Sequence, residues 1–341
     1  MAKDLMKALV YLAPEKLELR DIKIPQIEQD EVLIRVRACG ICGSDVFGYL
    51  GKTGRRIPPM VMGHEFAGEI TCIGNHVMGF AVGDRVTAQP ICFCGECDYC
   101  ISGRESLCTS QTMLGVLHTN GALCEYVKVR QRQLVRIPDT VSFDIAALAE
   151  PFAVAYSAVL KADVQGRRVA VIGTGTIGLF TIAALRLAQA GVIYAFDTIE
   201  AKRTMALKMG ATQAFDPSQK SALPSLLELT GGGVDVSFEA VGAESSVHTA
   251  MSCLKKGGTS VWIGNNIREI KIDMQQIVTR ELRVLGNFDY SQATFAEAVE
   301  KLTQQDLRSM ISETAPLVRA HECFQRLAEK RQPSLKTMIY F

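Results

Sequence analysis

Four cysteines near residue 100 have the spacing of a zinc site. They are Cys94, Cys97, Cys100 and Cys108, in the pattern Cys-x2-Cys-x2-Cys-x7-Cys. Gaps of two residues allow thiolates to converge on one centre, and four thiolates form the tetrahedral shell that zinc favours. The alternatives are a disulfide cluster or chance, and a 341-residue chain whose start does not look like a signal peptide is a poor candidate for disulfides. We therefore predict a zinc ion here, with no coordination position open to a substrate.

A second set of reactive side chains lies in two glycine-flanked loops. One loop, residues 39–45, carries Cys42, and the other, residues 62–65, carries His64. A thiolate and an imidazole together would form a mixed site suited to zinc, and a catalytic zinc needs a third protein ligand and an open position. A lone cysteine or histidine is more often an ordinary core residue, so the spacing alone leaves both interpretations open.

A glycine-rich turn further along the chain has the form of a dinucleotide-binding fingerprint. The turn, residues 173–178, follows an apolar strand at 168–172 and opens a helix, and the next strand, 192–196, ends on Asp197. Its three glycines would allow a tight turn, a close approach of the backbone to a pyrophosphate and close packing of helix on strand. Asp197 would bind the adenosine ribose hydroxyls and repel a 2′-phosphate, so the pattern favours NAD over NADP. An ordinary glycine-rich turn is the alternative.

The elements around these motifs indicate two kinds of fold. Residues 7–150 read mostly as short β-strands with Gly and Pro between them, which suggests a barrel-like β domain. Later in the chain strands and helices alternate, which predicts one doubly wound six-stranded α/β sheet. The six predicted strands are 168–172, 192–196, 213–215, 234–238, 259–264 and 282–286. A last strand at 335–340 is expected to return to the first domain. We place the domains at 1–153 with 291–341, and at 154–290.

The composition bears on partners and location. The chain has 37 basic and 36 acidic residues and a formal net charge of +1, so nothing in this balance favours nucleic acid or an acidic membrane surface. The apolar stretch 169–193 contains glycines and Arg186, and reads as strand, turn and helix rather than as a membrane span. Eleven cysteines and a start without an apolar signal core indicate the reducing cytoplasm.

Taken together, these motifs resemble those of the zinc-dependent medium-chain alcohol and polyol dehydrogenases, over essentially the whole chain. The motifs, in order, are Cys42-Gly43-Ser44-Asp45, Gly63-His64-Glu65, the cysteines at 94, 97, 100 and 108, Glu150-Pro151, and Gly173-Thr174-Gly175-Thr176-Ile177-Gly178. The resemblance implies an N-terminal GroES-like β-barrel catalytic domain and a six-stranded Rossmann domain that binds NAD.

The resemblance also implies two zinc ions per chain with different roles. The ion at the four spaced cysteines is structural in this family. The catalytic ion uses residues that match Cys42 and His64, and in the polyol branch a third ligand that matches Glu150. Glu65 matches a carboxylate that either binds this zinc or lies just behind it, and Asp45 matches one that orients the histidine ligand. Because a proline follows Glu150, we expect this residue at an element boundary and outside helical geometry.

The implied reaction is the oxidation of an alcohol by NAD. The alcohol is polarised by the catalytic zinc, Ser44 takes its proton, and hydride passes to the nicotinamide. The residues expected to bind the cofactor are Gly173, Gly175, Thr176, Ile177, Gly178, Asp197, Arg203 and Gly264.

The chain departs from the family pattern at two places. One concerns the relay that passes protons outward from the active site, and the other concerns the substrate. Many relatives carry a relay histidine at one of the two positions where this chain has Phe47 and Gly48. Sorbitol-type enzymes carry an arginine next to a tyrosine where this chain has Asp289-Tyr290. The chain therefore looks closer to galactitol-1-phosphate dehydrogenases. Arg55 and Arg56 could meet a substrate phosphate, or could belong to a solvated loop.

We therefore expect a homo-oligomeric enzyme, a dimer or tetramer, that oxidises a secondary alcohol of a polyol or polyol phosphate with NAD. In this family the edge strand, here near 282–286, often pairs across a two-fold axis. A butanediol- or threonine-type dehydrogenase is the alternative within the family. A non-catalytic NAD-binding redox sensor is the alternative from another class, and the presence of Cys42, Ser44, His64 and Glu150 counts against it.

Overall fold

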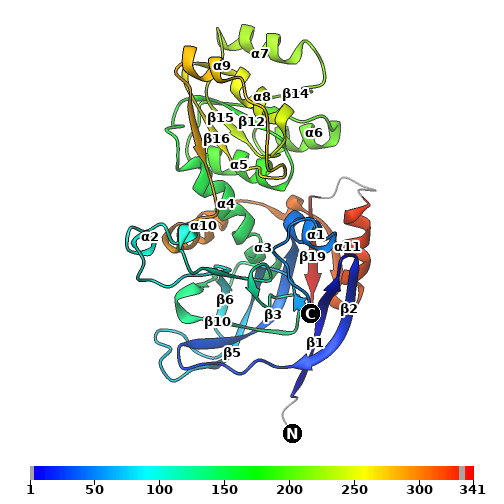
Figure 1. Cartoon of the computed structure of the whole chain (residues 1–341). Coiled ribbons are helices and arrows are strands. Elements are labelled where there is room, and N and C mark those ends of the chain that lie inside the picture. Colours follow the sequence, from blue (N-terminus) through cyan, green and yellow to red (C-terminus); the bar gives the residue numbers. More distant parts are fainter. Residues whose placement is uncertain (1–3, 330–334) are drawn as a thin grey trace. The chain divides into compact units, whose positions relative to one another are not determined.

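The chain divides into two compact units. The computed structural model describes residues 4–329 and 335–341 (Figure 1). Unit 1 consists of Met1–Glu150 and Tyr290–Phe341, and unit 2 of Pro151–Asp289. The boundaries expected from the sequence, after residues 153 and 290, lie close to these positions. Among the described residues no helix has the length and apolar character needed to cross a membrane.

Unit 1 is built mainly from β-strands. Its strands are β1 (Leu5–Ala13), β2 (Lys16–Lys23), β3 (Glu31–Ile41), β4 (Met60–Val61), β5 (Glu65–Ile73), β6 (Arg85–Ala88), β7 (Ile91–Cys92), β8 (Thr112–Leu114), β9 (His118–Thr119), β10 (Tyr126–Arg130), β11 (Leu134–Arg136), β18 (Ile311–Pro316) and β19 (Lys336–Tyr340). The largest sheet has the order β11-β6-β5-β3-β19-β18, with β10 also paired to β3. Two three-stranded sheets, β2-β1-β4 and β7-β8-β9, accompany it.

The helices of unit 1 are short. They are α1 (Gly43–Tyr49), α2 (Asp98–Ile101), α3 (Phe143–Ala147), α10 (Gln292–Leu302) and α11 (Ala320–Ala328). A further helix, α4 (Ala149–Val159), begins at the end of the first segment of unit 1. The prediction that residues 7–150 are mostly β does not include helices α1, α2 and α3 or the start of α4.

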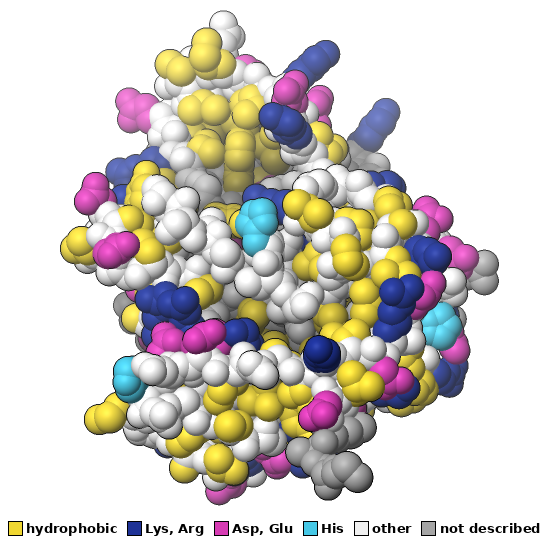
Figure 2. Space-filling model, turned by 60° about the horizontal axis from the view of Figure 1, so that its bottom comes forward, with side chains coloured by type: hydrophobic (Ala, Val, Ile, Leu, Met, Phe, Trp, Pro, Cys, Tyr) yellow, Lys and Arg dark blue, Asp and Glu magenta, His cyan; other side chains and the backbone are white. Residues whose placement is uncertain are grey.

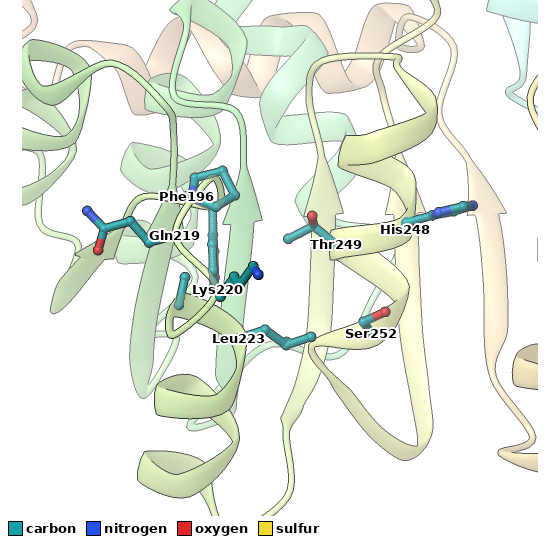
Figure 3. A pocket seen from close by; sticks show the side chains of 9 residues that line it. Phe196, Gln219, Lys220, Leu223, His248, Thr249 and Ser252 are labelled. Carbon is teal, nitrogen blue, oxygen red and sulfur yellow. The ribbon is translucent and has the colours of Figure 1, made fainter.

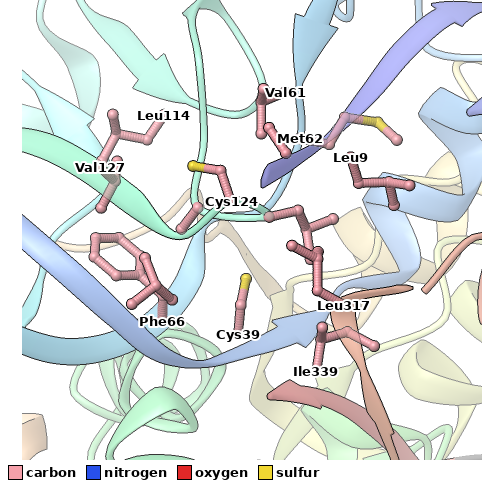
Figure 4. Packing of buried hydrophobic residues seen from close by; sticks show 14 of the residues in the cluster. Leu9, Cys39, Val61, Met62, Phe66, Leu114, Cys124, Val127, Leu317 and Ile339 are labelled. Atoms are coloured by element: carbon pink, nitrogen blue, oxygen red, sulfur yellow. The ribbon is translucent and has the colours of Figure 1, made fainter. Parts of the chain in front are cut away.

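Strand β3 is central to the core of unit 1. Val32, Ile34 and Val36 alternate along it as fully buried residues, as the two-residue period of a strand requires. At its end, Cys39 packs in the same hydrophobic cluster as Phe66 from β5 and Ile339 from β19 (Figure 4). This buried apolar cluster fixes the direction of β3, which leads into the loop that carries Cys42.

The C-terminal strand β19 lies directly beside the end of β3. The two strands are antiparallel, with Thr337 opposite Ile41 and Met338 opposite Gly40. The predicted return of the last strand to the first part of the chain is therefore confirmed. This pairing brings Lys336 next to the loop after β3.

Unit 2 is one parallel sheet with helices packed on it. Its strands are β12 (Arg168–Ile172), β13 (Val192–Phe196), β14 (Gln213–Phe215), β15 (Val234–Glu239), β16 (Leu254–Trp262) and β17 (Arg283–Gly286). Its helices are α5 (Thr176–Leu187), α6 (Glu200–Lys208), α7 (Ala222–Thr230), α8 (Glu244–Ser252) and α9 (Met274–Thr279). The strand order is β14-β13-β12-β15-β16-β17, and α5, α6 and α8 pack on these strands (Figure 1). The predicted doubly wound sheet is confirmed.

One sequence-based expectation about local structure is wrong. Pro151 was expected to keep Glu150 out of a helix, but Glu150 lies in the first turn of α4. A proline is tolerated at this place because the first N–H groups of a helix have no intrahelical acceptor. Glu150 is at an element boundary, as predicted, but in helical geometry.

The charged surface agrees with the near-neutral composition. On the face shown in Figure 2, acidic and basic side chains lie interspersed among apolar ones. This distribution is consistent with the formal net charge of +1.

The buried position of Ile339 predicts a large effect of truncation. Ile339 has no exposed surface, so Ile339→Ala should lower the free energy of unfolding by about 2–5 kcal/mol, since the removed atoms leave a cavity. The exposed Ile57→Ala, at 62% exposure, is the matched control and should change it by less than about 0.5 kcal/mol. Urea unfolding of the two variants would check this, and equal effects would contradict the assigned core.

Candidate active site

Three potential metal ligands of unit 1 lie together. The Sγ of Cys42, a ring nitrogen of His64 and a carboxylate oxygen of Glu65 are all within 4.8 Å of one another. Cys42 is the N-cap residue of α1, where its Sγ accepts a hydrogen bond from the backbone N–H of Ser44. His64 directly precedes β5, and Glu65 is the first residue of that strand. The adjacent antiparallel strands β3 and β5 thus present a thiolate, an imidazole and a carboxylate at one place.

Gly63 sets the direction of the chain before His64. Its φ is +96°, a region that other residues rarely adopt. A Cβ at this position would lie 2.9 Å from Sγ of Cys39 and 2.9 Å from Cγ of Leu123. Both the backbone angle and the tight packing therefore require glycine here, and they direct the imidazole toward Cys42.

The carboxylate of Asp45 is fully buried behind His64. Its Oδ1 lies 3.4 Å from Nδ1 of His64 and accepts a 2.6 Å hydrogen bond from Nη2 of Arg56. Its Oδ2 accepts a hydrogen bond from the backbone N–H of Cys42. Burial alone would raise the pKa of Asp45, but the charges of His64 and Arg56 outweigh it and hold the pKa well below its usual range. Asp45 is therefore ionised at neutral pH and orients the imidazole.

The chemistry of these donors fits a zinc ion. Zinc is commonly bound by thiolate, imidazole and carboxylate. Among the described residues, the buried Nδ1 of His64 makes no hydrogen bond of ordinary geometry. The nearest acidic oxygen is Oδ1 of Asp45, at 3.4 Å. Burial alone would lower the pKa of His64, but the nearby Asp45 and Cys42 raise it. A histidine that faces a carboxylate with one nitrogen and a thiolate on its other side is typical of a zinc site.

Glu65 is paired with a buried lysine. Nζ of Lys336 donates to both carboxylate oxygens of Glu65, at 2.7 and 2.6 Å, and both side chains are at most 3% exposed. Burial would lower the pKa of Lys336, but the negative charges of Glu65, Cys42 and Glu150 raise it. Glu150 therefore lies within electrostatic reach of the same ammonium group.

Glu150 has its own partner in unit 1. Its Oε1 accepts a 3.0 Å hydrogen bond from the hydroxyl of Tyr290, which is buried and stacked on Phe295. Glu150 is outside the compact group of three ligands found among the described residues. The structure thus brings Cys42, His64 and Glu65 together. The carboxylate of Glu150 is instead fixed by its hydrogen bond from Tyr290.

The four spaced cysteines form a second candidate metal site. Cys94, Cys97, Cys100 and Cys108 have their sulfur atoms within 4.8 Å of one another, and three of the S···S distances are 3.5, 3.5 and 3.8 Å. Four thiolates about 2.3 Å from a zinc ion would lie about 3.8 Å apart, so the spacing fits. Backbone N–H groups of Glu96 and Cys97 lower the pKa of Cys94 to about 6. The loop geometry therefore favours the thiolate that zinc requires.

Sequence reasoning missed the residue that anchors this cysteine loop. Arg132 donates a 3.1 Å hydrogen bond to the carbonyl of Cys94, and its guanidinium lies 4.9 Å from the ring centroid of Phe93. Nothing in the spacing of the cysteines indicates an arginine more than thirty residues away.

In unit 2, the fingerprint glycines and Asp197 are close together. Gly175 is the N-cap of α5, and a Cβ at Gly178 would lie 1.8 Å from the carbonyl oxygen of Gly173. The carboxylate of Asp197 accepts hydrogen bonds from N–H of Thr174 and from N–H of Ile199. The turn between β12 and α5 therefore has the close helix–strand packing that the fingerprint predicts.

Thr176 and Ile177 are the first two residues of α5, and two further cofactor candidates, Arg203 and Gly264, lie close to other groups of the protein. Arg203 donates to the carbonyl of Asp197 and lies 3.5 Å from Asp216. Gly264 follows β16, and a Cβ there would lie 2.1 Å from N of Gly242. Sequence reasoning missed Glu239, whose buried carboxylate accepts hydrogen bonds from the N–H of Gly242 and of the preceding residue.

A cavity of about 240 Å³ lies in unit 2 near the end of β13. Phe196, Lys220 and Thr249 are among the side chains that line it (Figure 3). His248 is also among the lining residues, and its Nε2 lies 2.8 Å from the carbonyl oxygen of Lys271. Phe196 is the last residue of β13 and directly precedes Asp197.

The two arginines that were considered for a substrate phosphate differ in position. Arg55 is exposed, whereas the side chain of Arg56 is 1% exposed and paired with Asp45. The expectation that Arg56 belongs to a solvated loop or faces a substrate phosphate is therefore wrong, because its guanidinium is committed to a buried carboxylate.

Comparisons with known proteins agree with this arrangement. Residues 28–139 match the family model of the alcohol dehydrogenase GroES-like domain, and residues 176–304 match that of the zinc-binding dehydrogenases. The sorbitol dehydrogenase of Bacillus subtilis strain 168 is 34% identical over 343 residues, which cover 98% of this chain and 97% of that protein.

Solved structures show the same fold. A protein of Sinorhizobium meliloti 1021, assigned as a zinc-binding dehydrogenase and bound to NADP, is 32% identical with a TM-score of 0.93, over 99% of this chain and all of that one. The galactitol-1-phosphate dehydrogenase of Escherichia coli is 26% identical with a TM-score of 0.92, over 98% of this chain and 100% of that one. The chain therefore belongs to the zinc-dependent medium-chain alcohol and polyol dehydrogenases, and is an oxidoreductase with a GroES-like domain and a Rossmann domain.

Proposed function

We propose that this enzyme oxidises a secondary alcohol group of a polyol or polyol phosphate, with NAD as hydride acceptor. The observation that carries the proposal is the arrangement of Cys42 and His64 as neighbouring donors, with the ionised Asp45 behind the imidazole. Family membership supports an enzyme rather than a non-catalytic redox sensor.

The catalytic zinc would be held by Cys42, His64 and Glu150. When bound, it supplies a Lewis acid that polarises the alcohol oxygen. Asp45 keeps the proton on Nδ1 of His64, which leaves the other ring nitrogen as donor. Glu65 uses both carboxylate oxygens on Lys336, which supports a place behind the metal rather than on it.

We propose that the hydroxyl of Ser44 receives the proton of the alcohol as its own proton leaves to water, which the exposed position of Ser44 allows. It is exposed, so a substrate hydroxyl can reach it, and its Oγ lies 3.3 Å from Sγ of Cys42. The hydroxyl is held by Nη2 of Arg56 at 3.1 Å. Its position next to a metal-binding thiolate supports its role in moving the proton of the alcohol.

Asp197 supports NAD as the acceptor. Its carboxylate lies beside the glycine turn of unit 2, where it would bind the ribose hydroxyls and repel a 2′-phosphate. Because a relative of 32% identity has been solved with NADP, both cofactors belong in the test.

Free and phosphorylated polyols are both candidate substrates. Sorbitol dehydrogenase and galactitol-1-phosphate dehydrogenase are both relatives, so family membership alone does not separate the two classes. With Arg56 buried, the exposed Arg55 is the better candidate in this loop for a phosphate contact. Butanediol and threonine stay in the substrate panel as the alternatives within the family.

Two zinc ions of unequal function are expected. Metal analysis should find two zinc ions per chain, and Cys42→Ser should keep only the one at the four cysteines and lose turnover. The exposed Cys72→Ser is the matched control and should keep both ions and full turnover. One zinc ion in the wild type, or two in an inactive Cys42→Ser, would contradict the assignment.

A substrate panel tests the reaction itself. Absorbance of the reduced cofactor should rise with NAD and at least one polyol or polyol phosphate, and much less with NADP. Arg55→Ala should raise the KM of a phosphorylated substrate and leave that of a free polyol unchanged. If zinc-loaded enzyme turns over none of the polyols, polyol phosphates, diols or threonine, the proposal is wrong.

We also propose a homodimer or homotetramer. The edge strand β17 of the unit 2 sheet is the candidate for pairing across a two-fold axis. Light scattering should give a mass two or four times the 37.2 kDa of one chain. A mass equal to that of one chain would exclude the assembly.

A further inference from the structure

Arg56 is a buried arginine that contacts two residues of the candidate active site. It comes from the loop between α1 and β4, and its side chain is 1% exposed. One nitrogen, Nη2, donates to Oδ1 of Asp45 at 2.6 Å and to Oγ of Ser44 at 3.1 Å. A single guanidinium thus links the carboxylate behind His64 to the hydroxyl beside Cys42.

The chain makes room for this side chain at Gly48. A Cβ on Gly48 would lie 2.0 Å from Cδ and 2.7 Å from Nε of Arg56, so any larger residue would displace the arginine. Because Gly48 has no side chain, the side chain of Arg56 can pass directly beside helix α1.

Hydrogen-bond chemistry fixes the direction of the Ser44 hydroxyl. A guanidinium has only donors, so Oγ of Ser44 must accept from Arg56 and its own hydrogen points elsewhere. The acceptor within reach is Sγ of Cys42, at 3.3 Å. A guanidinium has no acceptor and does not give up its proton in proteins. Arg56 therefore cannot accept a proton from Ser44.

We infer that Arg56 is a positioning residue for the oxidation. It holds the hydroxyl of Ser44 and the carboxylate of Asp45 at fixed positions relative to Cys42 and His64. The inference rests on the proposed function. Asp45 is the outer partner of His64, and loss of such a partner typically lowers activity or metal affinity about 10–100-fold. Loss of Arg56, which holds Asp45, should have an effect of up to this size. Removal of Arg56 should therefore act on the turnover rate and on the retention of zinc, and much less on the binding of substrate.

The variants are chosen to separate position from fold. Arg56→Ala removes the guanidinium, and Arg56→Lys keeps a buried cation with donors on one nitrogen. Gly48→Ala leaves Arg56 in the chain but places a methyl group on its side-chain path. Lys52→Ala removes an exposed cation of the same loop and is the matched control.

Two readouts are used on each zinc-loaded variant: kcat and KM with the substrate identified for the wild type, and the rate of zinc release to a chelator. Arg56→Ala and Gly48→Ala should each lower kcat about 10–100-fold with KM nearly unchanged, and should release the catalytic zinc faster. Arg56→Lys should recover part of the lost kcat, and Lys52→Ala should match the wild type. The double variant of Gly48→Ala and Arg56→Ala should resemble Arg56→Ala alone, because both changes remove the same interaction.

The opposite results would overturn the inference. These are wild-type kcat and zinc release in Arg56→Ala, a change of KM alone, or effects of Gly48→Ala and Arg56→Ala that simply add. If Arg56→Ala does not fold, Arg56→Lys and Gly48→Ala decide by the same measurements. If the wild type oxidises no alcohol, the proposed function fails, but the zinc-release rates still show whether Arg56 positions the metal site.

Discussion

The buried carboxylate of Asp45 is the constraint on which the rest of the site depends. A fully buried charge is stable only if it is paired and hydrogen-bonded, and Asp45 meets this need with Arg56, His64 and the N–H of Cys42. Each of these partners is thereby fixed by the same carboxylate. The orientation of the imidazole, the start of helix α1 and the position of Ser44 all follow from one charge that cannot be left unpaired.

A second buried ion pair connects the site to the end of the chain. Lys336 lies at the start of β19 and neutralises Glu65 at the start of β5. Because β19 pairs with β3, the strand that leads to Cys42 is held on one side by a residue from the C-terminal segment. Removing either partner of such a pair would leave an uncompensated buried charge, which typically destabilises a protein by about 3–5 kcal/mol. The site and the stability of unit 1 are therefore linked.

The parts of the site that the sequence predicted are those with short-range patterns. The four cysteines lie within fifteen residues and the glycine turn within six, so local spacing was enough to indicate both. The pairs Lys336–Glu65 and Tyr290–Glu150 join residues 271 and 140 positions apart, and only the topology brings them together. The sequence did not indicate that Arg56 is buried, because no local pattern shows that the missing side chain of Gly48 leaves space for it. The helical geometry of Glu150 was missed because a proline in the first turn costs no hydrogen bond.

The central claim is that this charge-balanced site holds a zinc ion with one thiolate and one imidazole, apart from the ion with four thiolates. X-ray absorption at the zinc edge tests it most directly, because it reports the ligands of the bound metal. The account predicts five sulfur ligands shared by two zinc ions, four from the cysteine loop and one from Cys42, together with imidazole nitrogen. A spectrum with four sulfur ligands per zinc ion and no imidazole contribution would contradict it.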